Sequence, residues 1–534
     1  MMRPVQPRLI ACLLYVGVPA TFGLLALLLG MDADWDLRNY HYYNAWALLT
    51  DRYQRDIAVA QIPTFYNPLL DVPYFLLAQV LSARGVAFVL GALHGLNFIV
   101  LACLAERLLT VANHWKRLGI AATVAGSGVC GAVALSEVGT VFYDNLLSLG
   151  LFCALLLGVH FWTSLIEQAW QRALPRAFAV GLPVGLAFGL KQTSVIYAVG
   201  LCLALLATLP ATPGRRIVVT FCCGLGVLAG LAAGGGYWMW HLWHLYGNPL
   251  FPMFNQVFRS PWGLIDSYRD TQYLEGSSLR HLFYPLVFSF DSRQASEIVF
   301  RDFRILAGFC LLPMVGLARL LRPRDDFGRG LLHPGPAAFV LVTAAASYVV
   351  WLQLFALYRY ITALEMLAPL LIVLSVGSFS RLDRARLPLA ICLIGLLVVS
   401  TRPGTWIRVP FSEKAVEATV PPINDPATTI VLLAGHEPLS FLLPSFPAEL
   451  RFLRIDSTFT NPDQTTVRFN DVMRSRIARH QGTILALFIP TERHDVITRL
   501  GDYGLQLSSA PCAAVTSPIG AAAYDLCPVE RLAQ

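Results

Sequence analysis

The chain has 534 residues, of which 56% are hydrophobic and 14% are charged. Its mean hydropathy of +0.58 excludes an ordinary soluble protein of this length, because such a protein needs more polar residues to cover its surface. The net charge of +7 is modest and does not indicate a nucleic-acid partner. Composition therefore predicts an integral membrane protein.

Apolar stretches near the ~20 residues that cross a bilayer recur up to residue 401. They lie at 9–30, 85–106, 118–135, 144–165, 177–190, 193–209, 217–239, 303–321, 335–357, 360–378 and 387–401. The first is too long for a secretory signal and no cleavage site follows it, so we expect a retained helix. The sequence predicts a mainly α-helical, polytopic bundle of about eleven spans over residues 1–401, with large outward loops at 31–84 and 240–302.

Basic residues gather on every second connection between the apolar stretches. The clearest are Arg3 and Arg8, Lys116 and Arg117, Arg215 and Arg216, Arg322, Arg324 and Arg329, and Arg381 and Arg384. Because cytoplasmic loops are rich in Lys and Arg, we expect a multi-pass protein of the cell inner membrane with a cytoplasmic N-terminus. One long helix over 177–209 would invert everything after it, so we expect two helices there, broken at "GLKQTS".

Residues 402–534 contain no spanning stretch. They alternate strand-like segments ("TTIVLLAG", "LRFLRID", "TILALFIP" and "AAAYDLCPV") with helical patterns at 466–480 and 493–502. This alternation predicts a small α/β domain, which the expected topology places in the periplasm. Its two cysteines, Cys512 and Cys527, are expected to form a disulfide in that compartment, with two free thiols as the alternative.

The first outward loop begins with "DADWDLRNYHYYNAWALL", residues 32–49. Trp35, Tyr42, Trp46 and Leu49 recur at helical spacing, which predicts a helix lying on the membrane surface with its aromatic face down. An interfacial anchor explains these aromatic residues. It does not explain why three aspartates are crowded together beside the membrane.

Charged residues also flank several other spans on the expected outer side. They are Glu137 and Asp144, Lys191, Arg301 with Asp302 and Arg304, and Arg359 with Glu365. Charges at a membrane are costly and by default indicate function. A carboxylate can accept the proton of a hydroxyl group, and Lys and Arg can hold a phosphate leaving group. Together these groups favour sugar transfer from a lipid-phosphate donor.

The sequence lacks the common motifs of soluble enzymes. It has no Walker loop, no Rossmann glycine fingerprint, no HExxH and no GxSxG, and its histidines form no convincing metal cluster. We therefore assign no metal ligands and no certain cofactor, and leave a requirement for a divalent metal open.

The order of these motifs resembles the GT-C superfamily of membrane glycosyltransferases, which includes protein O-mannosyltransferases and aminoarabinose transferases. Members carry an essential acidic residue in the first outward loop, and the segment from Asp36 to Tyr40 fits their Asp-x-x-x-Tyr spacing. The resemblance implies that Asp36 is the general base, with Asp34 in reserve. A second acidic residue of the family matches Glu137 or Asp144.

Further segments are similar to the same family. "GLAFGLKQTS" matches a glycine-rich GLKxT segment, which assigns Lys191 to the donor phosphate, and "YGNPLFPMFN" and "RYITALEMLAPL" match recurrent segments. We expect the phosphate to be held by Lys191, Arg301, Arg304 and Arg359, and the acceptor or sugar to contact Tyr40, His41 and Glu365. The implied partners are a polyprenyl-phosphate sugar donor, a glycan, lipid or protein acceptor, and the bilayer.

Two other functions compete with this interpretation. A transporter or lipid flippase would use charges along a pathway through the middle of the membrane, often with internal repeats. Here the charges are expected at one face, and no repeat is evident in the sequence. A scaffold or sensor whose exported domain does the work is the third hypothesis.

Overall fold

The structure is a computed structural model that describes residues 13–274, 276, 278–321, 330–457, 459–464, 466–520 and 523–532. Part of the predicted orientation rests on Arg3 and Arg8 and on the arginines at 322, 324 and 329, which lie outside the described residues. The chain forms two compact units. The first contains residues up to 28, 88–236 and 270–406, and the second contains 29–87, 237–269 and 407–534.

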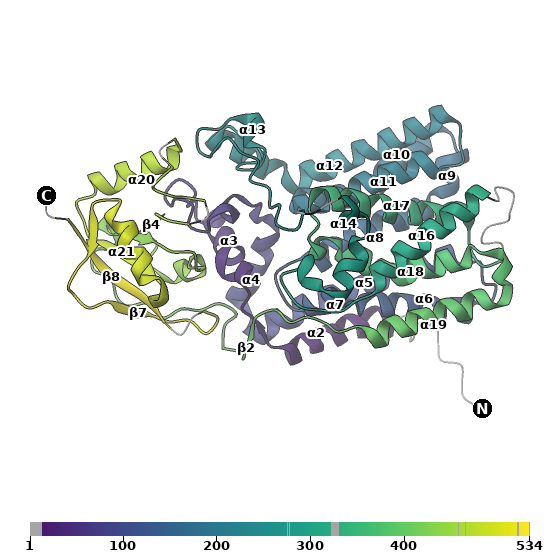
Figure 1. Cartoon of the computed structure of the whole chain (residues 1–534), viewed down its shortest axis with the longest axis horizontal. Coiled ribbons are helices and arrows are strands. Elements are labelled where there is room, and N and C mark those ends of the chain that lie inside the picture. Colours follow the sequence, from purple (N-terminus) through teal and green to yellow (C-terminus); the bar gives the residue numbers. More distant parts are fainter. Residues whose placement is uncertain are drawn as a thin grey trace. The chain divides into compact units, whose positions relative to one another are not determined.

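The first unit is helical (Figure 1). The helices that enter it are α2 (Val18–Leu29), α5 (Ala83–Leu108), α6 (His114–Val129), α7 (Ala132–Ser136), α8 (Asp144–His160), α9 (Trp162–Glu167), α10 (Trp170–Leu190), α11 (Val195–Thr208), α12 (Pro213–Tyr246), α14 (Ser278–Leu282), α15 (Tyr284–Phe290), α16 (Arg304–Leu321), α17 (Pro334–Leu354), α18 (Thr362–Gly377) and α19 (Arg386–Ser400). Each of the eleven predicted spans overlaps one of them, and residues 9–12 of the first span lie outside the described residues. The chain breaks between α10 and α11, at the "GLKQTS" segment, as expected.

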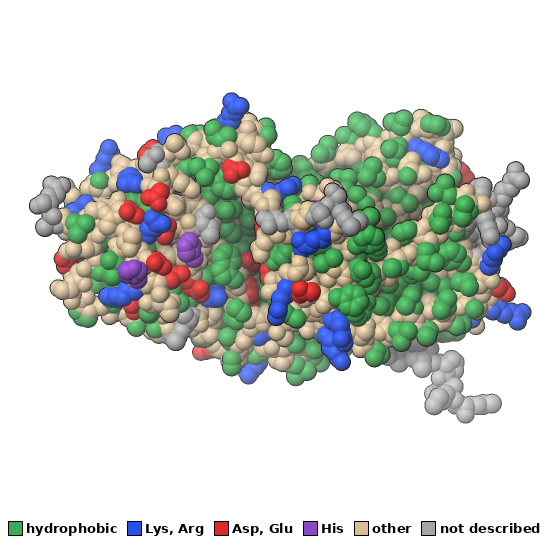
Figure 2. Space-filling model, in the orientation of Figure 1, with side chains coloured by type: hydrophobic (Ala, Val, Ile, Leu, Met, Phe, Trp, Pro, Cys, Tyr) green, Lys and Arg blue, Asp and Glu red, His purple; other side chains and the backbone are tan. Residues whose placement is uncertain are grey.

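The chain is a multi-pass membrane protein. Within the described part of the chain, six helices are long and apolar enough to cross a membrane, namely Ala83–Leu108, Trp170–Leu190, Pro213–Tyr246, Arg304–Leu321, Pro334–Leu354 and Tyr358–Gly377. The other predicted spans are helices of 12 to 17 residues. Figure 2 shows hydrophobic side chains over the visible face of α16 and α19. Such a surface is stable in lipid but not in water.

Helix α18 is the centre of the first unit. All 16 of its residues are buried, and it packs against α6, α8, α16, α17 and α19. Its sequence is apolar apart from Thr362, Glu365 and Ser375, and a helix that is apolar on nearly every side becomes buried.

Helices α10 and α12 approach so closely that only glycine fits between them. A Cβ atom added at Gly181 would lie 2.0 Å from the carbonyl oxygen of Cys223, and one at Gly185 would lie 2.2 Å from that of Val227. The four-residue spacing places both glycines on one face of α10. Membrane helices use small residues for such contacts because lipid provides no hydrophobic drive to associate. The contact holds the C-terminal half of α10, and the "GLKQTS" break begins at the end of this half.

Replacing Gly185 by alanine should lower the melting temperature of the purified protein in detergent, because the added methyl must displace the backbone at Val227. Overpacking of this kind costs about 1–3 kcal/mol. The matched control is Gly224→Ala in α12, where an added Cβ meets no atom within 4 Å. Equal melting temperatures for the two variants would contradict the close approach.

The C-terminal part of the second unit is the predicted α/β domain. Its elements are β3 (Ile430–Leu433), β4 (Arg451–Arg454), α20 (Arg468–Arg479), β5 (Ile484–Phe488), α21 (Arg493–Gly501), β6 (Leu505–Leu507), β7 (Ala513–Val515) and β8 (Tyr524–Arg531). The strand order is β4-β3-β5-β8-β6, and β7 also pairs with β8. Strands β3, β4 and β5 are parallel, with Ile430 opposite both Arg451 and Ile484, whereas β8 runs antiparallel to its neighbours.

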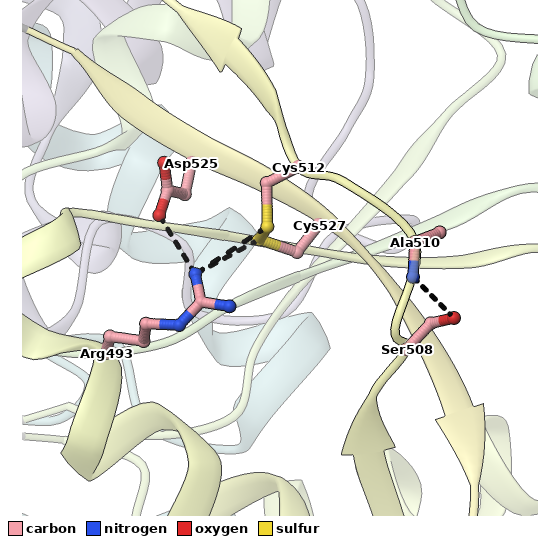
Figure 3. Close-up of a disulfide and its surroundings, with 6 residues drawn as sticks. All are labelled: Arg493, Ser508, Ala510, Cys512, Asp525 and Cys527. Atoms are coloured by element: carbon pink, nitrogen blue, oxygen red, sulfur yellow. Dashed lines mark hydrogen bonds and ion pairs between the residues drawn. A yellow bond between two sulfur atoms is a disulfide. The ribbon is translucent and has the colours of Figure 1, made fainter.

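A disulfide joins Cys512 to Cys527 in this sheet, with an S–S distance of 1.97 Å. Figure 3 shows Arg493 of α21 pointing toward the bond, and its Nη1 lies 3.2 Å from Asp525 Oδ2. The two sulfurs and the carboxylate are close enough to suggest a metal site. With both sulfurs bonded to each other, no thiolate is left to bind a metal there.

The first outward loop belongs to the second unit as well. Its elements are β1 (Met31–Asp32), the π-helical turn η2 (Leu37–His41), α3 (Tyr42–Leu49), the 3-10 turns η3 (Ile62–Phe65) and η4 (Pro68–Leu70), and α4 (Asp71–Val80). Strand β1 pairs with β2 (Arg408–Val409), and the short α13 (Asn255–Phe258) completes the unit. The predicted division into residues 1–401 and 402–534 remains a prediction, because it follows composition rather than contacts.

The prediction that the helix at residues 35–49 lies on the membrane surface is wrong for its central aromatic residues, Tyr42 and Trp46. Tyr42 and Trp46 are 6% and 8% exposed and pack inside the unit. The guanidinium of Arg52 lies 4.5 Å from the centre of the Trp46 ring, and Tyr42 packs on Phe75. Trp35 and Leu49, at the two ends of the predicted stripe, are 40% and 50% exposed. Residues 42–47 of α3 are all buried, so protein rather than lipid covers the middle of the stripe.

Candidate functional site

The two predicted catalytic carboxylates lie just before and at the start of η2. Asp34 is 2% exposed, and its Oδ1 accepts a hydrogen bond of 2.8 Å from the backbone N–H of Leu37. Asp34 therefore caps the turn that follows, in the manner of a helix N-cap. Asp36 is half-buried, and its side chain makes no capping hydrogen bond. The more accessible of the two carboxylates is that of Asp36.

The surroundings of Asp34 favour its protonated form. Burial raises the pKa of Asp34 well above its usual range, and the nearby carboxylate of Asp32 raises it further. The second carboxyl oxygen of Asp34 is buried and has no hydrogen-bond partner among the described residues. A buried carboxyl group with few donors holds its proton more tightly than one in water.

Tyr40 and His41 follow on η2. The Nδ1 atom of His41 lies 2.6 Å from Asp71 Oδ1, and both side chains are buried. A carboxylate in this position orients an imidazole ring and fixes its tautomer. The ring of Tyr40 stands edge-on to that of Tyr66. Asp71, which lies 30 positions after His41 in "PLLDVPY", was not among the predicted site residues.

In the first unit, two cations approach the carboxylate of Asp144. The Nζ atom of Lys191 lies 2.8 Å from Asp144 Oδ2 and 3.0 Å from the carbonyl oxygen of Phe142. The Nε atom of Arg359 lies 4.0 Å from the same carboxylate oxygen. Asp144 begins α8, where the helix dipole favours a negative charge. Lys191 occupies the break after α10, and Arg359 lies in the 3-10 turn η7 (Tyr358–Ile361) that leads into α18.

A second carboxylate, that of Glu137, belongs to the same cluster. Both of its oxygens are buried without a hydrogen-bond partner among the described residues. Burial raises the pKa of Glu137 well above its usual range, and Asp144 adds to this effect while Arg359 and Lys191 oppose it. The structure therefore brings four of the predicted residues together as two carboxylates and two cations. Glu297, which was not among the predicted site residues, also lies 3.6 Å from Arg359.

The predicted residues Arg304 and Glu365 serve the protein's own backbone. Arg304 is fully buried, pairs with Asp302, and donates to the carbonyl oxygens of Ser127 and Cys130. Asp302 in turn accepts a hydrogen bond of 3.0 Å from the N–H of Ala132. These bonds hold the turn between α6 and α7.

Glu365 binds the backbone N–H groups of the residues that follow this turn. Its Oε1 accepts hydrogen bonds of 3.1 and 3.0 Å from the N–H groups of Val133 and Ala134. These residues begin α7, which ends one residue before Glu137. The remaining predicted residue, Arg301, is exposed and donates from Nε to the carbonyl oxygen of Ser400.

Comparison with known proteins identifies the fold. A scan against protein-family models and a search of curated proteins both find no match. Among solved structures, the chain is similar to ArnT from Cupriavidus metallidurans bound to undecaprenyl phosphate, with a TM-score of 0.51 and 13% identity over 97% of this chain and 98% of ArnT. The apo state of that ArnT matches with a TM-score of 0.49, 13% identity and 98% of each chain. An Archaeoglobus fulgidus oligosaccharyltransferase in the apo form matches with a TM-score of 0.46 and 11% identity over 92% of this chain and 70% of that chain.

The chain is thus a multi-pass membrane protein that shares the fold of ArnT. The ArnT match spans nearly its full length, so the fold includes the C-terminal α/β domain as well as the helical unit. The resemblance inferred from the order of the sequence motifs is confirmed at the level of the fold. At 13% identity the match carries no residue assignments.

The raised pKa of Asp34 predicts a pH-dependent stability. A carboxyl group whose pKa is raised in the folded state stabilises the fold while protonated, and this contribution is lost as the pH rises through the folded-state pKa. The variant Asp34→Asn keeps a carbonyl oxygen for the Leu37 N–H but cannot ionise. The melting temperature of Asp34→Asn should therefore rise relative to that of the wild type as the pH increases from the ordinary pKa of an aspartate, about 4, through the raised pKa of Asp34.

The exposed Glu449 offers a control for this measurement. The variant Glu449→Gln removes a carboxylate from the same unit and should show no such trend. A constant difference between Asp34→Asn and the wild type across the pH range would contradict the prediction.

Proposed function

We propose that the protein is a membrane glycosyltransferase that moves a sugar from a polyprenyl-phosphate donor to an acceptor of the cell envelope. The observation that carries the proposal is the GT-C fold shared with ArnT over 97% of this chain, in a structure in which ArnT is bound to undecaprenyl phosphate. The carboxylates and cations assigned from the sequence are the kinds of group that such a reaction needs.

In the proposed reaction, a hydroxyl oxygen of the acceptor attacks C1 of the donor sugar. The bond between C1 and the phosphate oxygen breaks, and polyprenyl phosphate leaves with the bonding electrons. We assign Asp36 to accept the hydroxyl proton. Its greater accessibility supports this choice, whereas the capping bond of Asp34 supports a reserve role for that residue.

Lys191 and Arg359 are assigned to the donor phosphate, because cations held in place before the reaction stabilise the charge that develops on the leaving group. Asp144 would hold both cations in position between turnovers, and Glu137 remains the second acidic candidate. Tyr40 and His41 remain candidates for contacts with the acceptor or the sugar, and Arg301 for the phosphate. The internal hydrogen bonds of Arg304 and Glu365 favour a positioning role for those two residues.

We further propose that the protein lies in the cell inner membrane with a cytoplasmic N-terminus and a periplasmic C-terminal domain. The Cys512–Cys527 disulfide supports an exported domain, because such bonds rarely persist in a reducing cytosol. The identity of the sugar and of the acceptor, and any divalent metal, are left to experiment.

Transfer of labelled sugar from a polyprenyl-phosphate donor tests the function. Purified wild-type protein in nanodiscs should transfer sugar without any ion gradient, whereas a transporter or flippase would transfer none. Asp36→Asn should reduce the rate by ~10²–10⁴-fold, the usual contribution of a general base. It should leave the melting temperature nearly unchanged, since Asn keeps the size of the side chain.

Asp34→Asn serves as the comparison for Asp36→Asn. Activity retained in Asp36→Asn and lost in Asp34→Asn would exchange the two roles. Full activity in both variants would rule out a base on this turn.

Lys191→Met should raise the apparent KM for the donor by about 10-fold or more, since a hydrogen bond to a charged group contributes about 1.5–3 kcal/mol. Lys191→Arg should restore part of the affinity because it keeps the charge. Lys116→Met, which removes an exposed lysine of α6, is the control. An unchanged donor KM in Lys191→Met would remove this residue from the phosphate site.

A further inference from the structure

The carboxyl ends of the parallel strands form a distinctive edge of the C-terminal sheet. From β3 the chain crosses to β4 on one side and returns to β5 on the other. In open α/β sheets, a ligand typically binds where the connections diverge in this way, just beyond the strand ends. Residues 435–440 follow β3 at this position, and they contact the loop that carries Asp34 and Asp36.

The strongest of these contacts is an ion pair between Arg38 and Glu437. Arg38 Nη1 lies 2.5 Å from Glu437 Oε1, and the two side chains are only 10% and 27% exposed. The Nε atom of the same guanidinium donates a 3.1 Å hydrogen bond to the carbonyl oxygen of Ala33. One side chain therefore connects Glu437 to the backbone immediately before Asp34. Hydrogen bonds between charged groups are about twice as strong as neutral ones.

A second contact satisfies the backbone of η2. This element is a π-helical turn, whose wider hydrogen-bond spacing differs from that of the α-helix that follows. The hydroxyl of Ser440, which is fully buried, donates to the carbonyl oxygen of Asn39. Buried backbone carbonyls need such partners, so a side chain of the C-terminal domain helps to stabilise the π turn.

The segment that provides these contacts is itself held firmly. The buried guanidinium of Arg454, at the end of β4, donates to the carbonyl oxygens of Gly435 and Glu437 at 2.7 and 2.9 Å. The amide of Gln61 donates to the carbonyl oxygen of His436 at 3.1 Å. Residues 435–437 are thus tied both to the sheet and to the first loop.

We propose that Glu437 and Ser440 are positioning residues for Asp36. In this role, the C-terminal domain uses the strand-end edge of its sheet to hold the first loop, and so keeps the π turn in the conformation that directs the base toward the acceptor hydroxyl. The inference rests on the proposed function, because it explains how the base of that reaction is oriented. A reacting group displaced by about 1 Å can lose on the order of 10²-fold in rate.

The test uses Glu437→Gln in the full-length protein in nanodiscs. Gln keeps an oxygen that can accept from Arg38 but loses the charge, so the variant should fold while holding the turn less firmly. We expect kcat to fall about tenfold or more and KM for the donor to stay within about twofold. Amide hydrogen exchange of residues 34–41 should become faster. Ser440→Ala should shift both measurements in the same direction, and Glu437→Asp should recover part of the rate.

The matched control is Glu449→Gln, the variant of an exposed glutamate in the same unit. It should change neither kcat nor exchange at residues 34–41. The proposal is overturned if Glu437→Gln has the kcat of this control, or if it loses rate only in proportion to its folded fraction while exchange at 34–41 is unchanged.

Failure of the proposed function would be recognised separately. If the wild-type protein transfers no sugar, the glycosyltransferase assignment fails, and the assignment of Glu437 as a positioning residue for its base fails with it. Faster exchange at residues 34–41 in Glu437→Gln than in Glu449→Gln would then still support the mechanical link between the domain and the turn. Equal exchange in the two variants would overturn that link as well.

Discussion

The ion pair between Arg52 and Asp56 is the contact on which the second unit depends. Both side chains are almost completely buried, at 1% and 2% exposure. Burying two charges is favourable only when their remaining hydrogen-bonding capacity is also used. Asp56 also accepts from the Tyr43 hydroxyl and from the N–H of Phe452, and Arg52 donates to two backbone carbonyls just before β4. Each of these partners comes from either the first loop or the C-terminal domain.

The Arg52–Asp56 ion pair also places the first loop beside strand β4 of the sheet. Ile57, next to Asp56, forms a parallel bridge with Leu453 in β4. Its N–H donates to the carbonyl of Phe452, and its own carbonyl accepts from the N–H of Arg454. Strand β4 is otherwise the edge of the sheet, and an uncovered edge is prone to pair with other chains. The first loop therefore covers the edge of the C-terminal domain while that domain holds the loop.

Local sequence patterns predicted the elements of this fold well. The apolar stretches, the break at "GLKQTS" and the strand-like segments of the C-terminal domain all correspond to observed elements, because each depends on a short window of residues. The same windows could not show that protein covers Tyr42 and Trp46. They also could not reveal the partner of Arg38, since Glu437 lies 399 positions away.

The candidate site was predictable only in part, for a related reason. Charge beside an apolar span drew attention to Glu137, Asp144, Lys191 and Arg359, which the structure brings together. The same criterion selected Arg304, whose Nη atoms bind Asp302, Thr401 and two backbone carbonyls. A single sequence does not distinguish a charge directed at a substrate from one that is neutralised within the protein.

The separation between the Arg52–Asp56 pair and its partners has a consequence for synthesis of the chain. Arg52 and the carbonyl it binds at Leu450 are 398 positions apart. At about 5–20 residues per second, the ribosome needs on the order of tens of seconds to make the residues between them. During this time the first loop already exists, but β4, the edge strand with which it pairs, has not yet been made. The segment with the candidate base is therefore among the first to be synthesised and among the last to fold. In a chain that stops before β4, Arg52 and Asp56 would lack their partners from the C-terminal domain.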